Sequence, residues 1–290
     1  MIGACASQTE AQTETAQTLP ASTTTVTIET PNPAPVTVEM TQAEKFAAWK
    51  ADFTNRAIAK GYGANLVRGL IEPTKINEKA LDRDASQPEF SKPIWSYVEG
   101  AASADRLNQG RAKLASESGL FGQIEDRYKV SRHYLTAIWG LESAYGKILG
   151  DFDIIDALAT FAHDGRRSDF GENQLFAILD MLSRGDVRRD QLRGSWAGAM
   201  GMTQFIPTTM RDYAVDFDQN ANIDLRGSKA DALGSAAHYL SRHGWRWGEP
   251  AMAEVQLANG FDYSLSDGTR KTVNDWTVLG VRPMGEQRWS

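Results

Sequence analysis

The chain has little cysteine, no cluster of basic residues and no long apolar run, and each absence excludes a class of protein. Its 290 residues contain one cysteine, so no disulfide can form within the chain. The net charge is −6, and no group of lysines and arginines would follow a phosphate backbone, which argues against a nucleic-acid partner. No apolar run reaches the ~18 residues that a membrane-spanning helix needs. The length suits one large domain or two small ones.

The one cysteine, Cys5, stands in a sequence that predicts a lipid anchor. Ile2-Gly3-Ala4-Cys5 resembles the end of a bacterial lipoprotein signal, in which the cysteine is lipidated and becomes the first mature residue. The basic and apolar regions that precede such a site are missing, and the alternative is an incidental thiol in a flexible tail. Ala6, in place of Asp, is similar to signals sorted to the outer membrane. We therefore expect a periplasmic protein anchored to that membrane by acyl chains at Cys5.

The first forty residues differ in composition from the rest of the chain. After Cys5 they are rich in Thr, Ala, Gln, Glu and Pro, so they cannot bury enough apolar surface to order themselves. We therefore interpret residues 1–40 as a lipoprotein-type N-terminus with a disordered linker, and residues 41–290 as the folded domain.

Apolar residues in the folded part recur mostly at helical spacing, and strand-like alternation is scarce before residue 250. The exception is a stretch near the C-terminus in which apolar residues alternate with others, namely Val255 and Leu257, then Phe261, Tyr263 and Leu265. Ser266-Asp267-Gly268 then predicts a hairpin turn. The fold class is therefore mainly α with a small β element near the C-terminus.

One predicted helix, in the segment 131–150, carries a carboxylate on its apolar face. Ser131 is a suitable N-cap, and Leu135, Trp139 and Glu142 follow at steps of four and three, which places them on one face. A carboxylate among apolar groups loses hydration, which raises its pKa and prepares it as a general acid. The alternative is a glutamate that extends to solvent or binds an arginine or a backbone amide.

A second segment, 193–207, combines small residues with an amide and an aromatic ring. Its many Gly, Ala and Ser residues would let another molecule approach the backbone. Gln204 offers a donor and an acceptor together, and Phe205 offers an apolar surface. The combination suits a groove for amide-bearing sugars, and the alternative is a close crossing of two helices.

A third segment, 216–224, has oxygen-bearing side chains at alternate positions. Asp216, Asp218, Asn220 and Asn222 stand at positions 1, 3, 5 and 7 of a calcium loop of the EF-hand type, the last binding through its backbone carbonyl. Two departures count against this interpretation, because Ala221 replaces the usual glycine and position 12 lacks its glutamate.

Eight separate motifs resemble those of the lytic murein transglycosylases of the membrane-bound B type. The resemblance covers roughly residues 41 to 280, with the motifs in the family's order. The motifs are Gln87–Phe90, Ala137–Ser143 with Tyr145-Gly146, Ile155–Thr160, Arg166-Arg167, Gly194–Gly201, Gln204–Pro207, Tyr213–Asp218 and Gly234–Leu240.

The resemblance implies a lysozyme-like catalytic domain that cleaves the MurNAc–GlcNAc β-1,4 bond of peptidoglycan without a cofactor. The MurNAc C6 hydroxyl displaces the leaving sugar and gives 1,6-anhydroMurNAc, so one carboxyl serves as acid and then as base, and Glu142 matches it. The residues that match substrate-binding positions are Ser195, Gln204, Phe205, Arg166, Arg167 and Phe170.

The family's variant of the calcium loop takes a later carboxylate, which Asp231 matches. We therefore predict a structural Ca²⁺ ion held by Asp216, Asp218, Asn220, Asn222 and Asp231. The alternative for Asp231 is a capping box with Ser228 at the start of a helix.

Family members usually continue beyond the region around Val281, so we expect that the C-terminal end of this domain is truncated. Two alternatives to a transglycosylase therefore stay open. One is a lysozyme-type hydrolase in which Asp151, Asp153 or Asp164 activates water. The other is a non-catalytic peptidoglycan-binding protein that lacks part of its groove.

Overall fold

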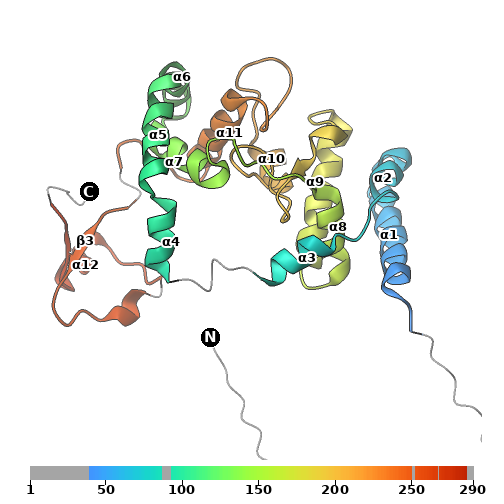
Figure 1. The fold of residues 1–290 in the computed structure, drawn as a ribbon, viewed down its shortest axis with the longest axis horizontal. Coiled ribbons are helices and arrows are strands. Elements are labelled where there is room, and N and C mark those ends of the chain that lie inside the picture. Colours follow the sequence, from blue (N-terminus) through green and yellow to red (C-terminus); the bar gives the residue numbers. More distant parts are fainter. Residues whose placement is uncertain (1–38, 87–92, 250–251, 267, 286–290) are drawn as a thin grey trace, which may run out of the picture. The chain divides into compact units, whose positions relative to one another are not determined.

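Helices dominate the part of the chain that the structure, a computed structural model, describes, namely residues 39–86, 93–249, 252–266 and 268–285 (Figure 1). The predicted lipidation site Cys5, nearly all of the predicted linker and the motif Gln87–Phe90 lie outside these residues. Within them, no helix has both the length and the apolar character needed to cross a membrane.

The prediction of a mainly α fold is confirmed. The α-helices of the described residues are α1 (Gln42–Ala59), α2 (Ala64–Ile71), α3 (Glu78–Ala85), α4 (Ile94–Ala101), α5 (Ala104–Ser116), α6 (Ser118–Tyr128), α7 (Arg132–Ser143), α8 (Ile154–Asp164), α9 (Ser168–Arg184), α10 (Pro207–Tyr213), α11 (Lys229–Arg242) and α12 (Val273–Val278). Two short 3₁₀ turns are η2 (Arg189–Gln191) and η3 (Tyr263–Ser266).

Local side-chain chemistry sets many of the helix ends. Thr41 and Glu44 form a capping box at the start of α1, and Asp153 caps α8. Helices α8 and α9 end where Gly165 (φ +90°) and Gly185 (φ +78°) adopt the left-handed conformation. These signals act within a few residues, so they lie within reach of sequence reasoning.

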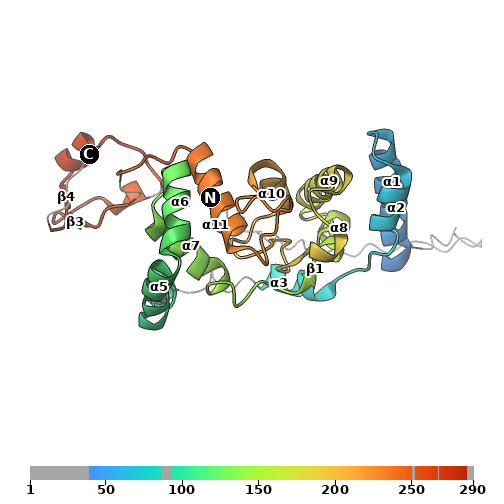
Figure 2. The ribbon, with the colours of Figure 1, turned by 90° about the horizontal axis from the view of Figure 1, so that it is seen from above.

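The buried apolar side chains form two clusters, which we call the first and second core. The first core lies among α1, α2, α8 and α9. Helices α8 and α9 lie side by side in both views (Figures 1 and 2). Their backbones approach closely at Gly171, where a Cβ atom would lie 2.6 Å from the carbonyl oxygen of Leu158. The second core lies among α6, α7 and α11 and includes Phe121, Leu135 and Trp139.

The segment Gly194–Ile206 connects the two cores. Met200 and Phe205 belong to the first core, whereas Met202 belongs to the second. Two backbone hydrogen bonds between Met200 and Phe205, of 2.8 and 3.0 Å, close this segment into a loop. The loop that carries three of the predicted substrate-binding residues is therefore anchored on both sides.

Two small antiparallel sheets complete the described fold. Strand β1 (Phe152–Asp153) pairs with β2 (Arg193–Gly194), and β3 (Val255–Leu257) pairs with β4 (Val281–Pro283). The second sheet confirms the predicted small β element near the C-terminus.

The predicted hairpin turn within this element is wrong, because the partner of β3 lies further along the chain. Residues Tyr263–Ser266 form η3, and α12 begins at a capping box between Thr272 and Asp275 before β4 starts. The ring of Phe261 contacts Tyr263 and Trp276, so the alternating apolar residues pack locally rather than along a strand. Asp267, at the centre of the predicted turn, lies outside the described residues.

Candidate active site

Helix α7 begins as predicted, and its buried face is set by steps of four residues. The Ser131 hydroxyl accepts a hydrogen bond of 3.3 Å from the His133 amide. Leu135, Trp139 and Ser143 are each at most 1% exposed. This stripe buries the helix against α11 and the segment Gly194–Ile206.

Glu142 lies beside this stripe rather than in it, so the predicted apolar stripe is wrong at this position. Ser143 follows Trp139 by four residues and takes the buried position, whereas Glu142 is exposed at the end of α7. The surrounding atoms still desolvate its carboxyl partly, and this desolvation raises the pKa of Glu142 above its ordinary value. No described residue donates a hydrogen bond to this carboxyl or forms an ion pair with it. Glu142 is therefore an open carboxyl that keeps its proton to higher pH than usual.

The chain leaves α7 through a tight left-handed turn that is fixed to the segment Gly194–Ile206. Ala144, Tyr145 and Gly146 have φ of +48°, +61° and +84°. The Ser143 hydroxyl accepts from the Gly146 amide at 3.0 Å and donates to the Met202 carbonyl at 2.7 Å. The residue next to Glu142 therefore ties the helix end to the loop that contains Ser195 and Gln204.

The small residues of Gly194–Gly201 face other parts of this chain. A Cβ atom on Gly194 would lie 2.0 Å from the Ala199 carbonyl oxygen, and one on Gly201 would lie 2.4 Å from the Leu225 carbonyl oxygen. The expectation that these glycines admit a ligand to the backbone is therefore wrong here, and close packing within the chain explains them. Ser195, half-buried, stabilises the turn because its hydroxyl accepts from the Ala199 amide at 3.1 Å.

Gln204 stands in a strained conformation at the other end of this loop. Its φ is +49°, which is uncommon for a residue with a side chain. Its Nε2 donates to the carbonyl of Gly201 at 2.8 Å and, at 3.5 Å, to that of Leu149 in the turn after α7. No described residue donates to its Oε1. The side chain therefore has an open acceptor beside the turn that follows Glu142.

Phe205 does not offer the open apolar surface that we predicted. Its side chain is 7% exposed and packs edge-on against Tyr239, with ring centroids 5.9 Å apart. The ring therefore supports the loop from the first core.

The two predicted arginines face a carboxylate of this chain. Arg166 and Arg167 both form ion pairs with Asp84 of α3, which is 4% exposed, and the Arg167 Nη1 lies 3.1 Å from its Oδ1. The Arg167 guanidinium lies 4.2 Å from the ring centroid of Phe170, and burial lowers its pKa. Arg167 and Phe170 therefore support one another, whereas the Arg166 side chain stays 58% exposed.

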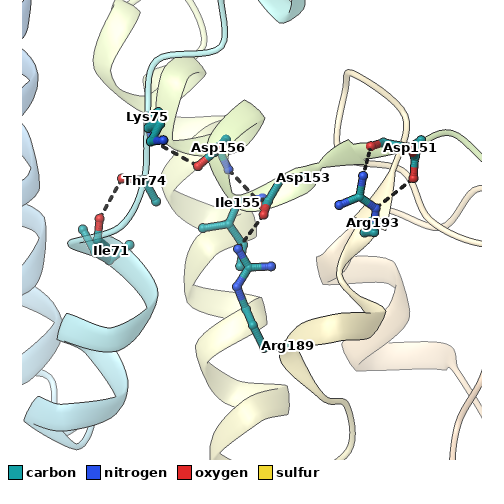
Figure 3. Close-up of polar contacts among 9 residues, drawn as sticks. All are labelled: Ile71, Thr74, Lys75, Asp151, Asp153, Ile155, Asp156, Arg189 and Arg193. Carbon is teal, nitrogen blue, oxygen red and sulfur yellow. Dashed lines mark hydrogen bonds and ion pairs between the residues drawn. The ribbon is translucent and has the colours of Figure 1, made fainter.

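Two of the acids proposed to activate water are paired with arginines (Figure 3). Asp151 accepts from the Arg193 Nε at 2.8 Å, and this hydrogen bond lowers the pKa of Asp151. Asp153 accepts from the Arg189 Nη2 at 2.6 Å and also caps α8. Asp164 is exposed at the end of α8.

Asp156 lies in the same view but contacts another segment. It accepts from the backbone amide of Lys75 at 3.1 Å, and burial raises its pKa (Figure 3). This half-buried carboxyl therefore fixes the segment after α2 to α8.

Three of the five predicted metal ligands converge at one place. Carboxylate oxygens of Asp216, Asp218 and Asp231 lie within 4.8 Å of one another. Asp231 is 0% exposed and burial raises its pKa, so three acids share a small volume in which a cation would relieve their repulsion. Ala221 has φ +66° and makes the sharp turn that a glycine usually makes. The donor set therefore fits a hard cation such as Ca²⁺.

The alternative capping box for Asp231 is only half formed. The Ser228 hydroxyl accepts from the Asp231 amide at 3.2 Å, which caps α11. The Asp231 carboxylate accepts instead from the amides of Phe217 at 2.8 Å and Asp224 at 2.9 Å. Asp231 therefore organises the segment Asp216–Ser228 before α11, which we call the acidic loop. In that loop, the Asn220 side chain accepts from the Asn222 amide at 2.9 Å.

Arg226 is a residue near the site that sequence reasoning missed. Its Nη1 donates to the carbonyls of Arg193 at 3.0 Å and Gly150 at 3.1 Å. Backbone acceptors distant in the chain leave no pattern in the sequence, so no sequence signal identifies this role.

Comparisons with known proteins identify similar chains. The chain is 34% identical over 159 residues to membrane-bound lytic murein transglycosylase B of Escherichia coli (strain K12). These residues make up 54% of this chain and 43% of that protein. SltB3 of Pseudomonas aeruginosa, solved in complex with NAG-NAM-pentapeptide, has a TM-score of 0.75 and 44% identity, covering 82% of this chain and 64% of that one. Slt35 of Escherichia coli, solved in complex with calcium, has a TM-score of 0.69 and 27% identity, covering 82% and 76%.

The chain therefore spans less than two thirds of transglycosylase B and of SltB3. The family described as "Transglycosylase SLT domain" matches residues 45–290, which include every described residue of the site built above. The end of α7, the Ser195–Gln204 loop and the acidic loop thus lie inside the matched region, and we conclude that this chain belongs to the transglycosylase SLT domain family.

Proposed function

We propose that this protein is a lytic transglycosylase that cleaves the MurNAc–GlcNAc β-1,4 bond of peptidoglycan and forms 1,6-anhydroMurNAc. The observation that carries the proposal is Glu142, an open carboxyl with a raised pKa at the end of α7. SltB3 was solved with NAG-NAM-pentapeptide and also with NAG-anhNAM-pentapeptide, at 44% identity to this chain, which supports the same substrate class here.

The proposed reaction needs one carboxyl in two protonation states. Protonated Glu142 donates its proton to the glycosidic oxygen as the bond to the MurNAc anomeric carbon breaks. The resulting carboxylate then accepts the proton of the MurNAc C6 hydroxyl, whose oxygen forms the new bond to that carbon. Holding the nucleophile within the substrate saves the entropy of bringing in a water molecule.

The geometry favours this reaction over hydrolysis by a second carboxylate. A water-activating acid must be ionised, open and close to the sugar. Both carboxylate oxygens of Asp153 accept hydrogen bonds, from the Ile155 amide and from Arg189, and Asp151 is paired with Arg193 through Oδ1.

We assign substrate contacts to the side chains that keep an exposed polar group. The Oε1 of Gln204 would accept from a sugar hydroxyl or acetamide group, and Ser195 lies on the same loop. Arg166, with its side chain 58% exposed beside Asp84, would bind a lactyl or peptide carboxylate. Phe205 would support the loop that carries Gln204, and Arg167 with Phe170 would support the segment that carries Arg166.

Product analysis on purified peptidoglycan sacculi tests the proposal. The wild-type protein should release muropeptides with 1,6-anhydroMurNAc ends, measured by mass spectrometry. E142Q keeps the shape of the side chain but transfers no proton, so the rate should fall by about 10²–10⁴-fold or more. E249Q, a change at an exposed glutamate distant in the sequence, is the control and should keep wild-type activity. Reducing ends would support the hydrolase, and absence of any release would support a binding protein.

We also propose that Asp216, Asp218, Asn220, Asn222 and Asp231 hold a structural Ca²⁺ ion. The convergence of three carboxylates supports this, as does the 27% identical Slt35, which was solved in complex with calcium. Millimolar Ca²⁺ should raise the Tm because the ion binds only the folded loop, and D216A should abolish that rise. Identical melting curves in Ca²⁺ and in EGTA would refute the site.

For localisation, we propose that the protein is periplasmic and held at the outer membrane by acyl chains on Cys5. The Ile2–Cys5 pattern supports this, and the 34% identical relative is named as membrane-bound. The chain, expressed behind a functional lipoprotein signal, should incorporate labelled palmitate and sediment with membranes, and C5A should do neither. Labelled C5A protein would refute acylation at this cysteine.

A further inference from the structure

We infer that Arg226 is a positioning residue for the proposed cleavage, since it clamps the turn after Glu142 to the loop that carries Ser195 and Gln204. The effect on cleavage rests on the proposed function, whereas the clamp itself rests on the hydrogen bonds of Arg226. Arg226 belongs to the acidic loop, and its side chain reaches the backbone of two other segments.

The clamp consists of hydrogen bonds from one guanidinium nitrogen. The Arg226 Nη1 lies 3.0 Å from the carbonyl oxygen of Arg193, 3.1 Å from that of Gly150 and 3.5 Å from that of Leu149. Hydrogen bonds from a charged donor are stronger than those between neutral groups. Arg193 immediately precedes the Gly194–Ile206 segment, and Gly150 ends the turn after α7. One side chain therefore bonds to both segments at once.

The backbone around Arg226 is fixed on two further sides. The Leu225 carbonyl accepts from the Met202 amide at 2.8 Å, so the residue before Arg226 pairs with the Ser195–Gln204 loop. The Arg226 amide donates to Asp224 Oδ1 at 2.9 Å, which holds it in the acidic loop. The backbone that carries the Arg226 side chain is therefore held in place by its own hydrogen bonds.

The other connections between the two segments leave room for a displacement near Glu142. The Ser143–Met202 hydrogen bond fixes the start of the turn, whereas the Gln204–Leu149 bond near its end is 3.5 Å long and correspondingly weak. Beyond Gly150 the pairing of β1 with β2 and the Arg193–Asp151 hydrogen bond hold the two segments together. Loss of Arg226 would therefore loosen the turn between Ser143 and Gly150 relative to Gln204, without separating the strands. A misplacement of about 1 Å between reacting groups costs up to about 10²-fold in rate.

The test combines hydrogen exchange with kinetics on the full-length protein. R226A removes the clamp, R226M removes the donors but keeps a long side chain, and R226K restores a charged donor on a shorter stem. The control is R188A, which removes the same charge from an exposed arginine whose ion pair, among the described residues, is with its near neighbour Asp190. Exchange is measured by mass spectrometry, and kcat and KM are measured on a soluble glycan tetrasaccharide that bears peptide stems.

In R226A and R226M, exchange should rise at least tenfold in peptides covering 144–151 and 193–205 but not in α8 and α9. The kcat should fall about 10- to 100-fold with KM within threefold, and R226K should recover part of the loss. The alkaline limb of the pH profile of kcat/KM, which reports the pKa of Glu142, should not move, because no described contact joins Arg226 to Glu142. R188A should match wild type.

Unchanged exchange in these peptides would overturn the clamp, whether or not the protein is active. Wild-type kcat in folded R226A or R226M, or a shifted alkaline limb, would overturn the positioning role. If both variants failed to fold, Arg226 would be a residue of the fold and the inference would be wrong. An inactive wild-type protein with the expected exchange pattern would refute the proposed function and leave the clamp standing.

Discussion

Replacing Gly150 with alanine, together with a control glycine that has no close neighbour, should distinguish the cost of a backbone clash from the cost of a left-handed backbone conformation. Gly150 has φ +72°, and a Cβ atom there would lie 2.2 Å from the Gly194 carbonyl oxygen and 2.6 Å from the Ser195 amide nitrogen. Both neighbours are backbone atoms, so no side-chain rotation can relieve the clash. The turn after α7 or the Ser195 loop must therefore move.

Two terms set the expected loss of stability. The left-handed conformation costs a residue with a side chain about 1–2 kcal/mol. Forcing an extra methyl group into a packed site costs a further ~1–3 kcal/mol. The free energy of unfolding should therefore fall by about 2–5 kcal/mol, which lowers the Tm by about 4–20 °C in a domain of this size.

The matched control is G185A at the end of α9. Gly185 has φ +78°, and a Cβ atom there would meet nothing within 4 Å, so only the conformational cost applies. Its Tm should fall by about 2–8 °C, because about 1–2 kcal/mol is lost without a clash.

Calorimetry and the rate of muropeptide release measure the two effects. G150A should lose activity below its Tm because Ser195 is displaced, whereas G185A should keep it. Equal Tm losses in the two variants, or full activity in G150A, would show that the two segments are not in the contact described here.

Four further predictions concern the residues around Glu142. S143A should lower the free energy of unfolding by about 1–3 kcal/mol in denaturant titrations, because it leaves the buried Met202 carbonyl without its donor; an unchanged midpoint would contradict this bond. Because burial raises the pKa of Glu142, the alkaline limb of kcat/KM should lie above the ordinary value of 4.5. Because this pKa is raised in the folded protein, the contribution of Glu142 to stability is present at low pH and is lost as the pH rises through the folded-state pKa. The Tm of E142Q should therefore exceed that of wild type only at higher pH. D151N, D153N and D164N should each leave the rate and the anhydro product nearly unchanged, and a loss of about 10²-fold in any one would indicate a two-carboxylate hydrolase.

The sequence by itself was sufficient for features that depend on near neighbours. The start of α7 at Ser131, the mainly α fold and the convergence of Asp216 and Asp218 all follow from side chains that contact backbone or one another within a few residues. Helical periodicity likewise depends only on local geometry, so it is readable without knowledge of the fold. Glu142 was correctly singled out as a carboxyl with a raised pKa, although its place on the helix was not.

The tertiary structure decided which side chains are open and which are engaged within the chain. Arg166 and Arg167 meet Asp84 some eighty positions away, Phe205 is buried against Tyr239, and the guanidinium of Arg226 reaches Gly150 across 76 positions. The sequence identifies the donors and acceptors at these places but not their partners. A partner is chosen by the path of the whole backbone, and a contact between distant segments leaves no periodic trace in either of them.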